Sequence, residues 1–209
     1  MCYNVQQKAN LKELTERFNA QFNLPKLYNP SNEVNGFTFP LLPVLTDQSP
    51  TFFDFLNWGL IPHWAKNEAI RKHTLNAKLE TLTEKPSFRD ASENRCILPV
   101  TGFYEWKWLD HKGSRKEKYL INIANEPVFG LAGIYSSWTN EGTGEQRKTF
   151  SLLTTEANPV MEEIHNTKKR MPLMLTPADC DVYLNQGEIR ISNELNTKVV
   201  ESDGQLDLF

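Results

Sequence analysis

Five runs of β-branched and aromatic residues in the middle of the chain constrain its fold more than any other feature. They cover residues 96–100, 102–108, 118–123, 128–138 and 148–155, and residues typical of turns separate them. Val, Ile, Phe, Tyr and Trp favour strands, and short connections join neighbouring antiparallel strands. The block therefore predicts a mostly antiparallel sheet at the centre of the protein.

The segments that precede this block predict smaller elements. Residues 1–7 read as a short strand, and Asn10 with Glu13 three positions later predicts a helix that begins with a capping box. The stretch 21–50 is rich in proline, which favours irregular backbone with edge strands. Residues 66–94 tolerate helix, with an interruption at Pro86.

After the block, Asn158 followed by Pro159 predicts the start of a short helix that ends near His165. Residues 171–175 predict a last core strand, and Pro177 opens a final helix. The fold class expected is α+β, a single domain with a curved, barrel-like, mostly antiparallel sheet flanked by helices. The domain should cover residues 2–190, with residues 191–209 as a flexible tail.

Composition places the chain among globular proteins. It has 209 residues, of which 39% are hydrophobic and 11% aromatic. No apolar run is long enough to span a membrane, and the N-terminus lacks the layout of a signal peptide. We therefore expect a monomer in the cytoplasm with no membrane partner.

The charge distribution does not decide between nucleic-acid binding and ordinary surface charge. The formal net charge is −3, which is not the basic balance typical of DNA-binding proteins. Residues 66–95 nevertheless hold seven Lys or Arg against five Asp or Glu, and residues 168–170 are Lys, Lys and Arg. These two clusters are compatible with a local basic groove and equally with a solvated surface.

Cys2 is the first candidate for chemistry. Removal of Met1 would leave a free α-amine and a thiol on adjacent carbons, with pKa values near ~7.7 and ~8.5. An aldehyde can form an imine with this amine, and the thiol then closes a five-membered thiazolidine. The alternative is a small buried hydrophobic residue. With Cys96 and Cys180 the cysteines are odd in number and widely spaced, so neither a disulfide framework nor a metal site is expected, and no cofactor.

Three further side chains could take part in catalysis. The amide of Asn76 offers donors and an acceptor to a sugar oxygen, or it caps a helix. Glu105 is a lone carboxylate in an aromatic strand, where apolar surroundings favour the protonated form that a general acid needs; alternatively it faces outward. His165 at a helix C-terminus can shuttle protons.

These segments in this order resemble the SRAP (SOS response-associated peptidase) family from Cys2 to about Leu184. Each block alone is short, but seven occur in register. The matching blocks are Met1-Cys2, WGLIPHWA (58–65), NAKLET (76–81), RCILP (95–99), GFYEW (102–106), GLAGIY (130–135) and RMP (170–172).

The resemblance implies a DNA-repair protein that binds single-stranded DNA and cross-links abasic sites through a thiazolidine, which shields the lesion. It implies that Cys2 is the nucleophile, that Asn76 orients the opened deoxyribose, that Glu105 is the acid or base and that His165 assists proton transfer. The DNA-binding candidates are Asn4, Trp64, Lys78, Arg89, Trp106 and Arg170. Base stacking is the expected role of the two tryptophans, and core packing is their alternative.

The sequence departs from the family pattern at three places. Tyr3 and Asn4 stand where the family has Gly-Arg, and Lys78 stands where the family has Arg, which removes a bidentate donor. The family's His-x-Arg-Met-Pro is three residues longer here, between His165 and Arg170.

The last five residues, QLDLF, resemble the peptide with which bacterial replication proteins bind the sliding clamp. Gln205 would anchor one end while Leu208 and Phe209 fill an apolar pocket. The protein would then act at replication forks on the nucleoid. A chance match at a chain end is the alternative.

Two other functions remain open at this stage. The first is a cysteine peptidase, autoproteolytic or general, in which Cys2 attacks a peptide carbonyl, although no oxyanion-hole motif is visible. The second is a non-catalytic adaptor for DNA or the clamp, which would work without the Cys2 thiol.

Overall fold

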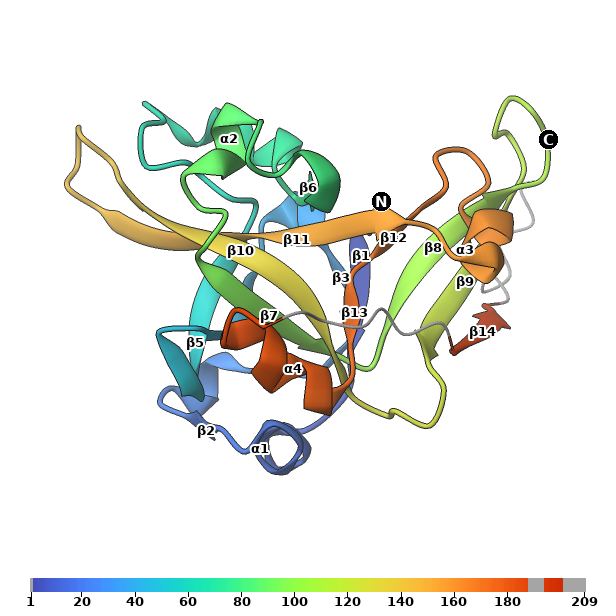
Figure 1. Ribbon diagram of the computed structural model, residues 1–209, viewed down its shortest axis with the longest axis horizontal. Coiled ribbons are helices and arrows are strands. Elements are labelled where there is room, and N and C mark those ends of the chain that lie inside the picture. Colours follow the sequence, from blue (N-terminus) through green and yellow to red (C-terminus); the bar gives the residue numbers. More distant parts are fainter. Residues whose placement is uncertain (1, 188–193, 201–209) are drawn as a thin grey trace.

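The computed structural model describes residues 2–187 and 194–200, and a closed five-stranded barrel is at its centre. Its strands are β4 (Leu41–Thr46), β5 (Ser49–Trp58), β7 (Arg95–Val100), β10 (Phe129–Thr139) and β11 (Gln146–Glu156). Neighbours pair antiparallel, and the parallel pairing of β11 with β5 closes the ring (Figure 1). A closed ring leaves these strands without a free edge.

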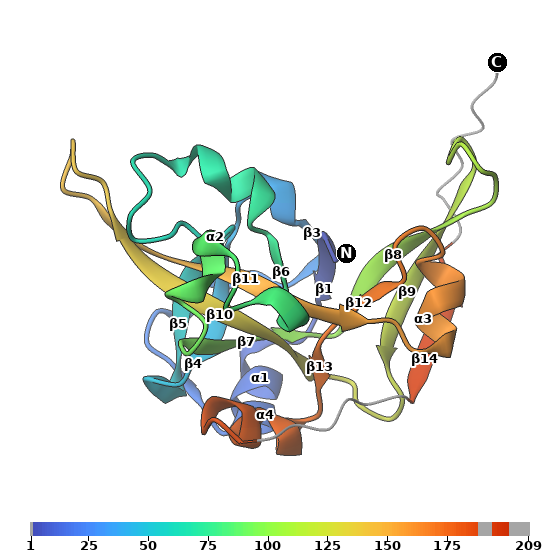
Figure 2. The same ribbon diagram turned by 45° about the horizontal axis from the view of Figure 1, so that its top comes forward.

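A second sheet stands beside the barrel, with β8, β9 and β14 farthest from it (Figure 2). All its pairings are antiparallel, in the order β14-β9-β8-β1-β3. Its strands are β1 (Asn4–Gln7), β3 (Ser31–Asn35), β8 (Gly102–Trp108), β9 (Lys116–Ile123) and β14 (Leu195–Val199). Only Thr101 separates β7 from β8, so the chain passes directly from one sheet to the other.

Short elements complete the fold around the two sheets. The other strands are β2 (Gln21–Phe22), β6 (Asn76–Lys78), β12 (Arg170–Pro172) and β13 (Met174–Leu175). The α-helices are α1 (Leu11–Phe18), α2 (Pro86–Arg89), α3 (Pro159–Ile164) and α4 (Pro177–Leu184). The 3-10 helices are η1 (Pro25–Leu27), η2 (Gly36–Thr38), η3 (Glu68–His73) and η4 (Leu79–Thr81). The predicted α+β fold with a barrel-like, mostly antiparallel sheet is confirmed.

Side-chain caps explain where the predicted helices begin. The Asn10 side chain accepts from the Glu13 N–H at 3.0 Å, and the Glu13 carboxylate accepts from the Asn10 N–H at 2.7 Å. The Asn158 side chain caps α3, and Pro159 occupies the first helical position, where no intrahelical donor is needed. The helices expected from Asn10 and Asn158 are therefore confirmed.

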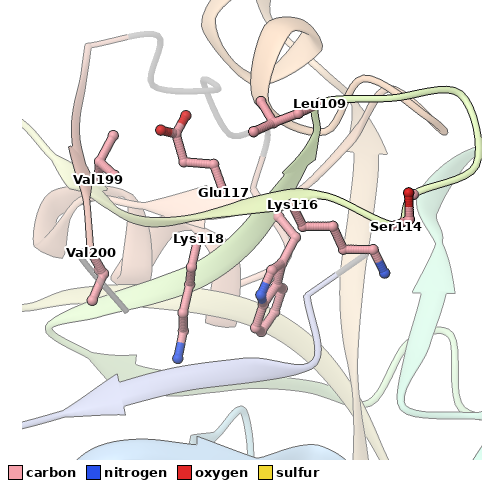
Figure 3. A pocket seen from close by; sticks show the side chains of 9 residues that line it. Leu109, Ser114, Lys116, Glu117, Lys118, Val199 and Val200 are labelled. Atoms are coloured by element: carbon pink, nitrogen blue, oxygen red, sulfur yellow. The ribbon is translucent and has the colours of Figure 1, made fainter. Parts of the chain in front are cut away.

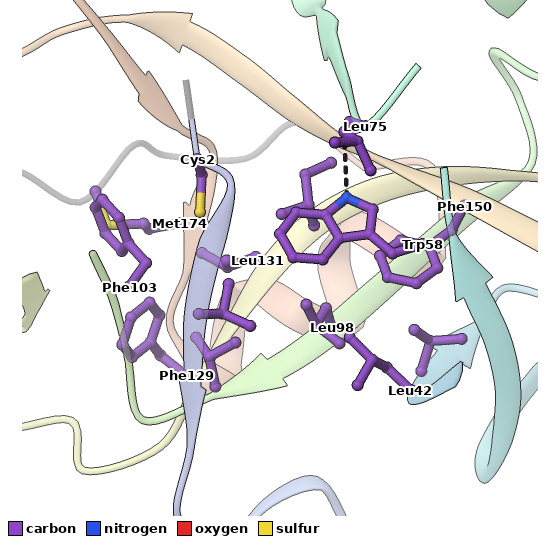
Figure 4. Packing of buried hydrophobic residues seen from close by; sticks show 14 of the residues in the cluster. Cys2, Leu42, Trp58, Leu75, Leu98, Phe103, Phe129, Leu131, Phe150 and Met174 are labelled. Carbon is purple, nitrogen blue, oxygen red and sulfur yellow. Dashed lines mark hydrogen bonds between the residues drawn. The ribbon is translucent and has the colours of Figure 1, made fainter. Parts of the chain in front are cut away.

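Trp58 is central to the core that the barrel shares with the second sheet. Its ring is fully buried, it stacks near Phe150, and its Nε1–H donates to the carbonyl of Leu75 at 2.8 Å (Figure 4). A Cβ on Gly36 would lie 3.0 Å from this ring, so the η2 turn packs closely on it. Cys2 belongs to the same buried cluster.

The structure differs from two expectations about local structure. The helix-tolerant stretch 66–94 contains only short helices, and Asn76 to Lys78 form β6, which pairs parallel with β11. The chain from residue 191 is not wholly a flexible tail, because β14 pairs with β9 and extends the second sheet. The clamp-binding candidates Gln205, Leu208 and Phe209 lie outside the described residues.

Among the helices of residues 2–187 and 194–200, none is long and apolar enough to cross a membrane.

The two tryptophans of the WGLIPHW segment, Trp58 and Trp64, should differ sharply in their contribution to the stability of the fold. Trp58→Ala removes a buried ring and its hydrogen bond, and should lower the free energy of unfolding by about 3–5 kcal/mol. Trp64 is 48% exposed, so Trp64→Ala should change the free energy of unfolding by less than about 0.5 kcal/mol. Urea unfolding followed by circular dichroism measures both, and equal losses would contradict the assignment.

Candidate functional site

Cys2 lies two residues before β1, at the junction of the two sheets. Its side chain is fully buried and faces the shared core near Leu131 and Met174 (Figure 4). Its thiol donates weakly to the Asn4 carbonyl at 3.8 Å, and the Asn76 amide donates to the Cys2 carbonyl at 2.8 Å. The backbone of Cys2 is therefore held from the barrel side through β6.

The surroundings of Cys2 keep its thiol protonated. Burial raises the pKa of the thiol far above its ordinary value, and the negative charge of Glu105 raises this pKa further. A thiol in this environment is not an activated nucleophile. Chemistry that begins with a Cys2 thiolate is disfavoured in this conformation.

Glu105 is buried on β8, one residue beyond the last pairing of β8 with β1, which joins Asn4 to Tyr104. Strand alternation puts the Glu105 side chain on the opposite face from its two aromatic neighbours, as expected from the sequence. Its carboxylate accepts from the Trp106 N–H at 3.1 Å. The outward-facing alternative for Glu105 is wrong.

His165 is buried and is the C-cap residue of α3, as the sequence predicts. Its Nδ1 lies 2.7 Å from the carbonyl oxygen of Arg170, and the Arg170 N–H is 3.2 Å from the same nitrogen. We assign the Nδ1 proton to the shorter contact, which makes Nε2 the proton acceptor. Burial lowers the pKa of His165 below 6.5, and the opposing charge of Glu105 does not reverse this.

Glu105 and His165 line one pocket of about 230 Å³. The pocket lies between the second half of β8, the residue that precedes β1 and the loop after α3. It is lined by Tyr3, Glu105, Trp106, Trp108, Lys116, His165, Thr167 and Lys168. Tyr3 follows Cys2 directly, so the pocket lies beside the candidate nucleophile.

Asn76 reaches the same region from the barrel. It begins β6, where it pairs with Leu152 of β11, and its Nδ2 is used by Cys2. Its Oδ1 is buried and has no hydrogen-bond partner among the described residues. An unused buried acceptor costs stability, so this oxygen is available to a hydroxyl or amine of a ligand. The helix-cap alternative for Asn76 does not hold, because Asn76 is in a strand.

The DNA-binding candidates are not gathered at one place. Trp106 lines the pocket, and Asn4 is half-buried at the start of β1, where it pairs with Tyr104 of the same strand β8. Trp64 is exposed, so its core-packing alternative is wrong, and Lys78 and Arg89 are also exposed.

Arg170 corrects a further expectation. Its guanidinium is buried and donates to both Glu80 carboxylate oxygens, at 3.0 and 2.7 Å, and to the Thr154 carbonyl at 2.7 Å. A buried guanidinium committed to these acceptors is not a DNA-contacting side chain. Its structural contribution is to join β12 to η4 and β11.

No site role was predicted for Tyr3, Trp108, Lys116, Thr167 or Lys168, which also line the pocket. Two signals were available, the proximity of Tyr3 to Cys2 along the chain and the basic cluster at residues 168–170. A larger groove of about 870 Å³ shares Trp106 and Lys116 with this pocket. The groove runs along β9 past Lys118 to Val199 and Val200 (Figure 3).

Among residues 2–187 and 194–200, no three His, Cys, Asp or Glu side chains are grouped to hold a metal ion. The three cysteines are buried and free.

A family model described as SOS response associated peptidase (SRAP) matches residues 1–207. The chain belongs to this family. It is 38% identical over 187 residues to the abasic site processing protein YoqW of Bacillus subtilis strain 168, covering 88% of this chain and 80% of YoqW. It is 25% identical over 197 residues to the abasic site processing protein HMCES of Xenopus tropicalis, covering 80% of this chain and 56% of HMCES.

Solved structures share the fold of this SRAP chain. A crystal structure of a protein from Bacteroides thetaiotaomicron superposes with a TM-score of 0.87 at 35% identity, over 97% of this chain and 93% of that one. A protein from Bordetella bronchiseptica superposes with a TM-score of 0.79 at 19% identity, over 96% of this chain and 100% of that one. At 19% identity, the match to the Bordetella bronchiseptica protein supports only the shared fold.

Arg170 should contribute to stability. Arg170→Met removes the donor of the hydrogen bonds to Glu80 and to the Thr154 carbonyl, so the free energy of unfolding should fall by about 1–3 kcal/mol. The matched control is Lys169→Met, because Lys169 is an exposed neighbour; it should change stability by less than about 0.5 kcal/mol. Urea unfolding compares them. An Arg170→Met protein of unchanged stability would contradict the internal role.

Proposed function

We propose that this protein processes abasic sites in single-stranded DNA by forming a covalent cross-link through Cys2. The observation that carries the proposal is the placement of Cys2 beside a pocket that holds a buried carboxylate and a buried imidazole. The names of the relatives supply the substrate class, because YoqW and HMCES are both abasic site processing proteins.

The order of bond formation follows from the burial of the thiol. The protonated thiol is a poor first nucleophile, whereas the α-amine exposed by loss of Met1 has a pKa near ~7.7 and is partly unprotonated at neutral pH. The amine attacks the aldehyde carbon of the opened sugar, and loss of water gives an imine. The Cys2 sulfur then adds to the imine carbon while its proton passes to the nitrogen, which closes the thiazolidine. One water is released overall.

The neighbouring side chains have separate roles in this scheme. The neutral Nε2 of His165 accepts a proton from the attacking amine, and the Glu105 carboxylate, once it has taken up this proton, delivers it to the hydroxyl that leaves as water. The buried Oδ1 of Asn76 accepts a hydrogen bond from a sugar hydroxyl. Trp106 stacks a base of the strand that continues along the groove of Figure 3.

The raised pKa of Cys2 argues against the peptidase alternative. A cysteine peptidase needs a thiolate, which a neighbouring base or cation stabilises. Here burial and the charge of Glu105 both oppose thiolate formation. An adaptor that does not use the thiol remains an outcome of the experiment below.

Cross-linking should depend on the free N-terminal cysteine. Protein without Met1, mixed with single-stranded DNA that contains one abasic site, should give an adduct that survives denaturing electrophoresis. Cys2→Ser and a form that retains Met1 should give no stable adduct, because neither can close the ring. Cys180→Ser is the control: Cys180 is a second buried cysteine, on α4, outside the pocket lining, so the adduct should persist. Equal cross-linking by Cys2→Ser and wild type would refute the proposal.

The pH dependence of cross-linking should report His165. Its lowered pKa means that the neutral, proton-accepting form is lost only as pH falls below 6.5. At lower pH the logarithm of the rate should fall with a slope of about two, because the α-amine and His165 both become protonated. His165→Gln should react more slowly and reduce this slope to about one. An unchanged slope would exclude His165 as the base.

A further inference from the structure

Two lysines stand on the rim of the pocket that holds Glu105 and His165. Lys116 begins β9, and Lys168 lies in the loop between α3 and β12; both line the pocket and both are exposed. Within residues 2–187 and 194–200, neither forms an ion pair with a carboxylate. Two nearby lysines differ in this respect, because Lys118 pairs with Glu33 and Lys169 pairs with Glu162.

Lys116 is positioned by the hairpin of β8 and β9. It pairs in register with Trp108, and its Nζ lies 5.1 Å from the centroid of the indole ring. A cation over an indole face is attracted by the ring quadrupole, while the ammonium keeps its donors for another partner. The β8–β9 hairpin thus presents one positive charge to the pocket.

Lys168 is positioned by Asn166, whose side chain makes two hydrogen bonds with the backbone of Trp108, as a neighbouring strand would. The Asn166 Nδ2 donates to the Trp108 carbonyl at 2.9 Å, and the Trp108 N–H donates to Asn166 Oδ1 at 3.2 Å. The Lys169 N–H donates a hydrogen bond to the His165 carbonyl at 2.9 Å, which closes the loop. The three additional residues between His165 and Arg170 therefore form an ordered wall of the pocket.

We propose that Lys116 and Lys168 bind the phosphodiester next to the abasic nucleotide, and that Asn166 is a positioning residue for Lys168. This rests on the proposed function. A nucleotide whose sugar reaches Cys2 carries a phosphate on each side, and these phosphates lie at the rim of the pocket. Two ammonium groups without a protein carboxylate as partner match a phosphate in charge and hydrogen bonding.

The experiment measures equilibrium binding of single-stranded DNA that contains a tetrahydrofuran abasic analogue. This analogue has no aldehyde, so binding is separated from cross-linking. Each phosphate contact in single-stranded DNA contributes about 0.7 to the slope of log K against log salt. Lys116→Ala and Lys168→Ala should each lower this slope by about 0.7 and weaken binding about five-fold at ~0.1 M salt. Lys169→Ala, on the same loop but outside the pocket lining, should bind like wild type.

A neutral methylphosphonate in place of one phosphate locates the contact. Placed beside the abasic analogue, on the side that the lysines contact, it should weaken wild-type binding about five-fold and weaken Lys168→Ala binding less, because that variant has already lost one of its two donors to this phosphate. A methylphosphonate several nucleotides away should weaken both proteins equally. Asn166→Ala should show the same reduced salt slope as Lys168→Ala. The double variant Asn166→Ala with Lys168→Ala should show no further reduction of the slope.

The outcomes separate this inference from the proposed function. If wild type cross-links aldehyde-containing DNA while Lys116→Ala, Lys168→Ala and Lys169→Ala all bind the analogue like wild type, the phosphate contact is wrong and the function stands. If wild type binds the analogue with the expected lysine dependence but forms no adduct with the aldehyde, the cross-linking function is wrong and the phosphate contact stands.

Discussion

The hydrogen bond from the Asn76 amide to the Cys2 carbonyl is the contact on which the site depends. Asn76 is held by β6, which pairs with the barrel strand β11, and Cys2 leads into β1 of the second sheet. The bond therefore joins the start of the chain to both halves of the fold. Without it, the first residues would gain the freedom typical of a chain terminus, and a reactive amine there would lose its alignment.

The geometry around Cys2 separates the tasks of its two functional groups. The thiol is packed among apolar side chains, where burial keeps it protonated and protects it from oxidation. The α-amine would be at the side of the pocket that Glu105 and His165 line. Such an arrangement suits a reaction in which the amine acts first and the thiol traps the product. It does not suit peptide hydrolysis by a thiolate.

Much of the fold could be predicted from local sequence, and the failures have physical causes. Capping at Asn10 and Asn158 is encoded by neighbouring residues, so both helix starts were predictable. The strand at Asn76 was not, because it exists only through pairing with β11, far along the chain. The strand Leu195–Val199 was missed for the same reason, since its polar residues pair along the outer edge of β9.

The candidate site likewise combines residues that local sequence could predict with residues whose role depends on tertiary packing. Cys2, Asn76, Glu105 and His165 were identified from residue chemistry and family resemblance, and the structure places Glu105 and His165 on one pocket. Charge alone was misleading for Arg170, because whether a guanidinium faces DNA or Glu80 depends on tertiary packing. For the same reason, the lysines that line the pocket could not be distinguished in sequence from other surface charges.

The most direct test of the central claim is to identify the atoms of Cys2 that bind the aldehyde carbon. The adduct would be digested with nuclease and protease, and the N-terminal peptide analysed by tandem mass spectrometry before and after borohydride treatment. A thiazolidine predicts attachment at Cys2, loss of one water, no gain of hydrogen with borohydride, and no alkylation of the thiol by iodoacetamide. Attachment at a lysine, or an adduct that borohydride reduces, would contradict the account.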